Sequence, residues 1–290
     1  MVRILPDHLT KINSLYAVVR NLAMAVFVSE NSKKRTSRLD FKLMKSLIIG
    51  LLLLVVGLGG VSGATYYSRA TGNWDGPVWS TTSGGTAGTA SITSSDDVII
   101  QTGNTITVNV AAVCYNLTIN SGATLTVSGT NTLTVSNNWT NNGIFTSGSG
   151  TVNLIGNNST NIDGSSTTNF YNLTINKGAA TTSVTNSSKV FSIGNNLTVT
   201  QGNLILQSVS ADYNIVNDLI VNTNGTLTHS VAWDVDWKLL SVGGNISIDG
   251  KFTYTKRSLV QMSGINKTIR TGPFPSSFEF WLKYLKLSTD

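Results

Sequence analysis

The stretch Asn116-Leu117-Thr118-Ile119-Asn120 decides the fold of this chain, because close copies of it recur along the sequence. In most copies an Asn precedes two apolar residues separated by one polar residue, the alternation of a strand that buries one face. Clear copies also begin at Asn172, Asn196, Asp218 and Asn245, degenerate ones at Asn138 and Tyr284, and Asp97-Val98-Ile99-Ile100 starts the series. Self-similarity of this kind indicates a repeat protein.

The spacing between copies predicts the architecture. Leu173 to Leu197 is 24 residues, Leu197 to Leu219 is 22 and Leu219 to Ile246 is 27. The 56 residues from Leu117 to Leu173 are interpreted as two coils. Periods of about 20–30 residues without a helical phase are typical of one turn of a β-solenoid, whose coils stack at ~4.8 Å. We therefore expect an all-β protein with roughly seven to ten parallel coils.

Each coil is expected to place a glycine corner between two short strands. A second alternating strand follows the glycine, as Leu204 and Leu206 follow Gly202. Glycine can adopt the positive φ that such a corner needs, and the corner glycines are Gly122, Gly178, Gly202, Gly225 and Gly250. The asparagines that open the phrase are expected to stack in one column and to hydrogen-bond from coil to coil. This structural ladder would contain Asn116, Asn172, Asn196 and Asn245.

A signal peptide is predicted at residues 44–64. Met44-Lys45-Ser46 precedes an apolar run from Leu47 to Leu58, which is shorter than the ~20 residues of a membrane-spanning helix. Ser62 and Ala64 are small residues at a cleavage site, so the mature chain would begin at Thr65. Residues 1–43 are interpreted as a start codon placed too far upstream or a disordered extension. Residues 65–95 are expected to form an N-terminal cap and residues 96–290 the solenoid, truncated at its C-terminal end.

The net charge of +6 belongs to the leader. Residues 1–64 contain nine basic and three acidic residues, whereas residues 65–290 contain eleven of each. The body lacks the cationic surface that a phosphate backbone requires, so we expect no nucleic-acid partner. The single cysteine, Cys114, is expected to be a small buried residue in a strand.

The start of the mature chain resembles a known group of proteins. The residues Tyr66-Tyr67-Ser68-Arg69-Ala70-Thr71-Gly72-Asn73-Trp74-Asp75, then Val78-Trp79-Ser80 and Asp96-Asp97-Val98-Ile99-Ile100, resemble the opening of Bacteroidota-type secreted or outer-surface β-helix repeat proteins. The resemblance covers roughly Tyr66 to Ser288 and implies a right-handed parallel β-helix with an adhesin-like role. Such proteins often carry a C-terminal sorting domain, which is absent here. No catalytic residues carry over, because the matching positions are structural.

Four tryptophans are candidates for stacking against sugars. Trp74 and Trp79 lie near the mature N-terminus, where the alternative is an aromatic plug over the first coil. Trp233 and Trp237 enclose Asp234-Val235-Asp236. His229 is expected to line the wall of the solenoid, since the equivalent positions of other coils carry Leu206 and Tyr254.

Asp234 and Asp236 are the weak metal candidates. On a strand their carboxylates would share one face at about 7 Å, which suits a hard cation such as Ca²⁺ or an acid–base pair. A Ca²⁺ site needs more than two oxygen ligands, and no third acid lies nearby in the sequence. We therefore expect a solvated acid pair, with no catalytic residue, metal or cofactor.

These features predict a secreted or cell-surface structural and adhesive β-solenoid that is not an enzyme. Its partners would be extracellular glycans or cell-surface components, and it would meet the membrane only through the signal peptide during export. The alternative is a polysaccharide-binding or polysaccharide-degrading β-helix protein, of the lyase or glycoside hydrolase kind. Such enzymes need charged groups clustered across neighbouring coils, and the acids of this chain do not show that register.

Overall fold

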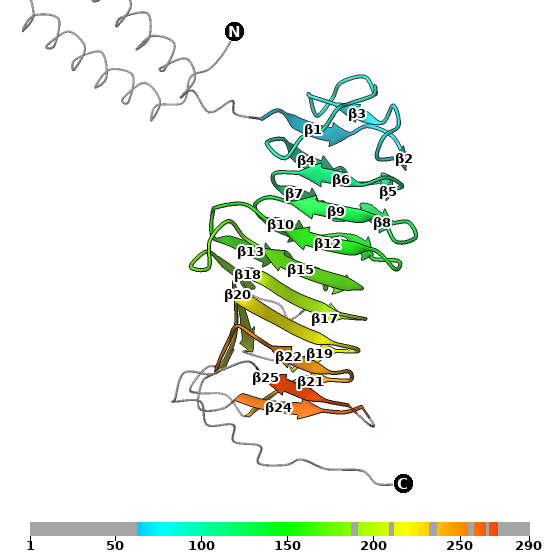
Figure 1. Ribbon diagram of the computed structural model, residues 1–290. Helices are drawn as coiled ribbons and strands as arrows, with labels where there is room; N and C mark the ends of the chain where they lie inside the picture. The colour runs from blue at the N-terminus through cyan, green and yellow to red at the C-terminus, as the bar shows by residue number, and fades with distance from the viewer. Residues whose placement is uncertain are drawn as a thin grey trace, which may run out of the picture. The chain divides into compact units, whose positions relative to one another are not determined.

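The computed structural model describes residues 63–186, 191–208, 212–231, 237–254, 258–264 and 267–271. Within these ranges the chain forms strands and turns and no helix. The strands wind into a β-solenoid of about seven turns (Figure 1). The all-β solenoid predicted from the repeat is therefore confirmed. The predicted leader up to residue 62 and the segment from residue 272 onward lie outside the described residues.

Each full turn contributes one strand to each of three faces, because alternating apolar residues need a common interior. Face 1 is a parallel ladder that begins with β1 and includes β4, β7, β10, β13, β16, the later halves of β18 and β20, and β23. The bounds are β1 (Thr65–Ser68), β4 (Asp97–Ile100), β7 (Leu117–Ile119), β10 (Trp139–Asn141), β13 (Thr160–Asp163), β16 (Ser183–Asn186), β18 (Leu197–Ser208), β20 (Leu219–Val231) and β23 (Lys251–Tyr254).

Face 2 is made of two smaller parallel sheets that follow one another along the chain. The first contains β2 (Gly72–Asn73), β5 (Thr105–Val108), β8 (Thr124–Val127) and β11 (Ile144–Thr146). The second contains β14 (Asn169–Phe170), β17 (Ser192–Ile193), β19 (Tyr213–Ile215), β21 (Lys238–Val242) and β24 (Ser258–Met262).

Face 3 completes each turn and is joined to face 1 in the later turns. Its own strands are β6 (Ala112–Cys114), β9 (Thr132–Val135), β12 (Thr151–Leu154), β15 (Asn172–Asn176), β22 (Ile246–Ile248) and β25 (Ile269–Thr271). The first halves of β18 and β20 lie on face 3 and their second halves on face 1. Faces 1 and 3 therefore form one continuous sheet.

The N-terminal cap already contains the first strand of the solenoid. β1 pairs in parallel with β4, so that Tyr66 lies opposite Val98. The short strand β3 (Trp79–Ser80) pairs with β1 in the antiparallel sense. The described part of the ladder thus starts at β1 in the predicted cap, one strand before Asp97.

The register confirms most of the repeat but corrects one spacing. Val98, Leu117 and Trp139 lie opposite one another on face 1. From Leu117 two full turns lead to Ile162, because Trp139 also pairs with Ile162. Leu173 lies eleven residues further on, in β15 on face 3. The interpretation of Leu117 to Leu173 as two coils is therefore wrong, since the phrase changes face between these copies.

The interior is filled by side chains that stack from turn to turn. Leu173, Leu197 and Leu219 lie in one column, and each is at most 1% exposed. Leu206, His229 and Tyr254 also lie opposite one another, and His229 is fully buried, as predicted. Cys114 is fully buried as well. These contacts confirm that the alternation in the sequence separates core from surface.

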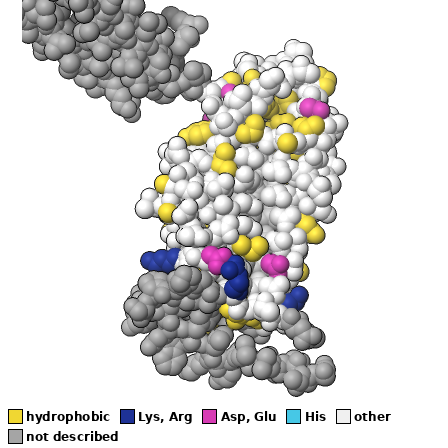
Figure 2. Space-filling view, in the orientation of Figure 1, with side chains coloured by type: hydrophobic (Ala, Val, Ile, Leu, Met, Phe, Trp, Pro, Cys, Tyr) yellow, Lys and Arg dark blue, Asp and Glu magenta, His cyan; other side chains and the backbone are white. Residues whose placement is uncertain are grey.

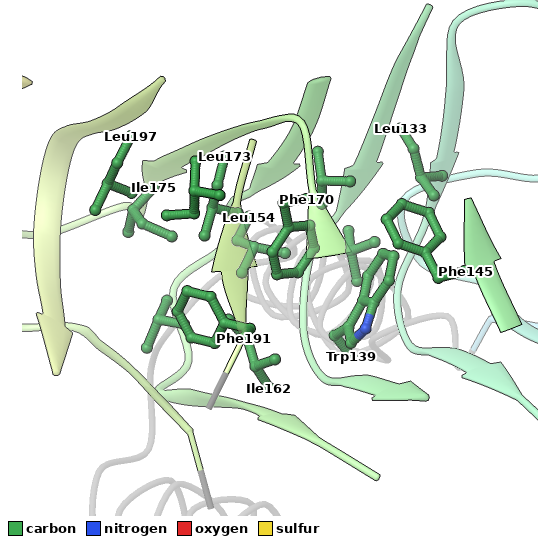
Figure 3. Close-up of a cluster of buried hydrophobic side chains, with 14 of the residues drawn as sticks. Leu133, Trp139, Phe145, Leu154, Ile162, Phe170, Leu173, Ile175, Phe191 and Leu197 are labelled. Atoms are coloured by element: carbon green, nitrogen blue, oxygen red, sulfur yellow. The ribbon is translucent and has the colours of Figure 1, made fainter. Parts of the chain in front are cut away.

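An aromatic stack runs through the middle turns of the core, and Figure 3 shows its first part. Trp139 contacts Phe145 and Phe170 with ring centroids at 4.8 and 5.2 Å. The series continues from Phe170 through Phe191 to Tyr213 at 5.6 and 5.4 Å. Nearly perpendicular rings at these distances add attraction beyond the burial of their area.

The glycine corners divide into two kinds. Gly122 and Gly202 have φ of +74° and +100°, as the corner model predicts. Gly178, Gly225 and Gly250 are not among the positive-φ glycines, so the prediction is wrong for them. At Gly225 a Cβ would lie 2.3 Å from the Val199 carbonyl oxygen. Glycine is required there by close packing against the preceding turn.

Candidate functional site

The two tryptophans of the cap lie inside it. Trp74 and Trp79 are 5% and 2% exposed, and their rings meet edge to face at 5.2 Å. Trp79 Nε1 donates a hydrogen bond to the Trp74 carbonyl oxygen at 2.7 Å. Burial leaves neither ring a free face for a sugar, so the stacking prediction is wrong for this pair. Their placement is that of the alternative, an aromatic plug.

Of the other candidates, only Trp237 is described. It lies directly before β21 and is 57% exposed. Trp233, Asp234 and Asp236 lie outside the described residues. Elsewhere in the described part of the chain, no group of three or more His, Cys, Asp or Glu side chains is placed to hold a metal ion.

The predicted asparagine ladder is two separate columns. On face 3, Asn172 Oδ1 accepts the Asn196 N–H at 3.4 Å, and Asn196 Oδ1 accepts the Asp218 N–H at 3.0 Å. Asp218 Oδ1 then accepts the Asn245 N–H at 2.6 Å. The structure therefore brings Asn172, Asn196 and Asn245 together, with Asp218 between the last two.

Asn116 belongs to the other column. Its amide nitrogen donates to Asp97 Oδ1 at 2.8 Å, and its Oδ1 accepts the Asn138 N–H at 3.1 Å. This column lies on face 1, because the phrase at Asn116 precedes β7 whereas the later copies precede face-3 strands. The prediction of a single column is thus wrong for Asn116, for the same reason as the 56-residue spacing.

The ladder contacts also differ from a stack of equivalent amides. Each acceptor oxygen receives a backbone N–H from the next turn, and in two cases a second donor comes from the preceding residue. Asn195 Nδ2 donates to Asn172 Oδ1, and Asn217 Nδ2 donates to Asn196 Oδ1, both at 2.9 Å. These side chains therefore satisfy backbone groups at a corner, where the regular strand ladder is interrupted.

Asp96 fixes the entry into the first turn. Its Oδ2 accepts hydrogen bonds from the Thr93 N–H and Oγ1 at 2.7 and 2.6 Å, and its Oδ1 accepts the Ala64 N–H at 2.7 Å. Burial alone raises the pKa of this carboxyl, but these hydrogen bonds outweigh it and the pKa is lowered. The predicted turn-forming role of Asp96 is confirmed by the contacts to Thr93.

Two buried bases have strongly shifted pKa values. Lys177 is 1% exposed, its Nζ donates to the Ile155 carbonyl oxygen, and burial lowers its pKa to about 8. Burial lowers the pKa of His229 to about 4, while the nearby Asp212 carboxylate acts in the opposite direction. Burial also raises the pKa of the Cys114 thiol, with Asp97 adding to the shift. All three side chains lie in the wall or core, away from any exposed surface.

The surface around Trp237 combines apolar and polar side chains. Tyr213, Leu240 and Val260 lie opposite one another in β19, β21 and β24, and Tyr213 and Leu240 point into the core. Because side chains alternate along a strand, the neighbouring residues point outward. We call the outward set the late face-2 patch; it consists of Asp212, Asn214, Trp237, Leu239, Leu259 and Gln261.

The patch is held together across three turns. The Leu239 N–H donates to Asp212 Oδ1 at 2.8 Å, and Leu239 lies opposite Leu259. Sequence reasoning identified Trp237 but missed Asp212, which is 25 residues earlier. That separation is about one coil, so aligning the coils by their buried Tyr213 and Leu240 would have placed the two side by side.

Charge is unevenly distributed over the solenoid. Figure 2 shows Lys and Arg side chains near the later turns of the face in view, and few charged groups over the earlier turns. The one ion pair among the described residues joins Arg270 to Asp249 at 2.6 Å. The described residues also include no helix long and apolar enough to cross a bilayer.

Comparison with known proteins gives no relative for this chain. No protein-family model, curated protein or solved structure matches it.

Proposed function

We propose that this protein is a secreted or cell-surface structural and adhesive module, without catalytic activity, built as a right-handed parallel β-helix. Its export would use the signal peptide at residues 44–64, and its surface would meet extracellular glycans or other cell-surface components. The proposal follows the resemblance of Tyr66–Trp79 and of the repeat to Bacteroidota-type adhesin-like proteins.

The observation that carries this proposal is the uniform outer surface of the early turns. On face 2 the outward positions of β5, β8 and β11 are threonines, except for Ile144. They stack as Thr105 on Thr124 and as Thr107 on Thr126 on Thr146. A flat, uncharged face of hydroxyl and methyl groups suits repeated weak contacts with a hydroxylated surface better than chemistry on a bound substrate.

The buried titratable groups support the same conclusion. Asp96 binds backbone and side-chain donors of the cap, and Lys177 binds a carbonyl oxygen of the preceding turn. Asp97 and Asp218 accept hydrogen bonds in the two ladders. These groups stabilise corners of the solenoid, and general acid–base catalysis would need them to face a substrate.

The test is expression of the full chain in a secreting bacterial host, followed by cell fractionation and an adhesion assay on glycan-coated beads. We expect the chain outside the cytoplasm, processed near Ala64, and increased bead retention. Retention of an unprocessed chain in the cytoplasm would contradict the export, and unchanged bead binding would contradict the adhesive role.

The second candidate function is polysaccharide binding or degradation, and the exposure of Trp237 favours its binding form. A reducing-sugar release assay on the same polysaccharides separates binding from cleavage. Sugar release that is lost in Asp234→Asn or Asp236→Asn would replace the adhesive proposal with an enzymatic one.

A further inference from the structure

We propose that the late face-2 patch is a binding site for a neutral polysaccharide, with Trp237 as the stacking platform. This inference rests on the proposed adhesive function and names its ligand class and its location. Sugar rings present C–H groups on one side and hydroxyls around the edge, so a site needs an exposed aromatic face bordered by hydrogen-bonding groups.

The patch supplies the apolar half of that requirement. Trp237 is 57% exposed, whereas the core of the described chain buries Trp74, Trp79 and Trp139. Leu239 lies two residues after Trp237, and Leu259 lies opposite Leu239 in the next turn. Both leucines are only partly buried. The indole therefore borders an apolar surface that extends over two turns.

The polar half comes from Asp212, Asn214 and Gln261. Asp212 Oδ1 accepts the Leu239 N–H, which fixes the carboxylate beside the strand that Trp237 precedes. Asp212 is exposed, and its second oxygen has no hydrogen-bond partner among the described residues. The side-chain amides of Asn214 and Gln261 are likewise free of partners within that part of the chain.

The register sets the geometry of the site. Asp212 lies one strand spacing from Leu239 and is thus diagonal to Trp237, at roughly 8 Å between backbone positions. Asn214, Ser241 and Gln261 form a second row beside the first. Turns stack at ~4.8 Å, close to the length of one sugar unit in an extended chain. A polysaccharide that runs along the solenoid axis would meet an equivalent set of positions at each unit.

Charge selects the class of ligand. Within the patch the only formal charge is the Asp212 carboxylate, which accepts hydrogen bonds from sugar hydroxyls and repels uronate carboxylates. Nucleic acid needs several cations in one place, and the patch has none. A protein partner would bury a larger surface, of roughly 800 Å² per side. A neutral polysaccharide is the ligand whose chemistry fits these groups.

The same face of the early turns provides a matched control. Ile144 is 60% exposed at an outward position of β11, where its neighbour in the preceding turn is Thr124. Ile144→Ala removes an exposed apolar side chain from face 2 as Trp237→Ala does, but far from Asp212 in the sequence and turn order. Asp212→Asn keeps an oxygen for the Leu239 N–H and removes the charge.

The experiment is affinity electrophoresis of the full chain in gels that contain soluble mixed-linkage β-glucan, xylan, galactomannan or polygalacturonate. We expect at least one neutral polysaccharide to retard the wild type, an affinity lowered at least tenfold by Trp237→Ala and severalfold by Asp212→Asn, and no effect of Ile144→Ala. Circular dichroism of each variant verifies the fold.

The outcomes separate the site from the general function. If folded Trp237→Ala and Ile144→Ala both bind like the wild type, the site is wrong while glycan adhesion stands. If only polygalacturonate retards the wild type, or no polysaccharide does, the neutral-glycan inference is overturned. The adhesive function is then decided by bead binding, which includes non-glycan cell-surface components as a separate arm.

Discussion

Asn245 donates both its backbone N–H and its side-chain amide to the same oxygen of Asp218, at 2.6 and 3.2 Å. Asp218 occupies the place that Asn196 has in the preceding turn. The ladder on face 3 therefore needs an acceptor oxygen at this position and does not need an amide.

Two substitutions of Asp218 test that requirement. Asp218→Ala leaves the Asn245 N–H without its partner and should lower the free energy of unfolding by about 1–3 kcal/mol. Asp218→Asn retains the acceptor and should stay within about 0.5 kcal/mol of the wild type. Urea denaturation at neutral pH measures both. Equal losses in the two variants would show that the charge matters more than the acceptor.

Lys177 should make the protein more stable in mild alkali. Its pKa is about 8 in the folded chain against 10.5 in the unfolded one, so at neutral pH folding buries a charged amine. Between pH 8 and 10.5 the unfolded state binds more protons, and the free energy of unfolding should rise by up to about 3 kcal/mol. Denaturation at pH 7.5 and 9.5 tests this.

Lys177→Met is the control for that pH dependence. Met keeps much of the apolar stem and removes the titrating group. The difference between wild type and variant should therefore shrink or reverse in favour of the wild type as the pH rises. A pH-independent difference would mean that the amine titrates normally in the folded protein.

His229 should destabilise the protein in acid. Its pKa falls from 6.5 in the unfolded chain to about 4 in the folded one, so the folded state keeps the imidazole neutral. As the pH falls from 6.5 to 4, the unfolded state takes up a proton first, and up to about 3 kcal/mol of stability is lost. His229→Leu, which copies Leu206 of the preceding turn, should reduce this loss in thermal melts between pH 7 and 4.5. An identical acid profile for both proteins would assign the loss to other groups.

The aromatic stack should be sensitive to truncation at its centre. Phe170 is 1% exposed and contacts Trp139, Phe145 and Phe191. Phe170→Ala should lower the free energy of unfolding by about 3–5 kcal/mol, because it leaves a cavity between turns. Phe170→Leu fills much of that volume and should cost clearly less. Similar losses for both would indicate that ring contacts, and not volume, dominate.

Local alternation and its period determined the fold class from the sequence alone. Leu197 and Val199 alternate with Thr198 about one coil away from Leu219 and Val221, and the structure places them opposite one another. This works because a strand has a period of two, and because a solenoid lets each turn contact only its neighbours. The wall position of His229 followed from the same alignment.

The tertiary structure alone decided which copies share a face and which side chains meet. The phrase at Asn116 looks like the one at Asn172, but insertions between them shift it from face 1 to face 3, and one strand reads the same on either face. Composition likewise did not reveal that Trp79 is buried and Trp237 exposed. Asp212 and Trp237 are brought together because stacking turns converts a separation of one coil into a single strand spacing.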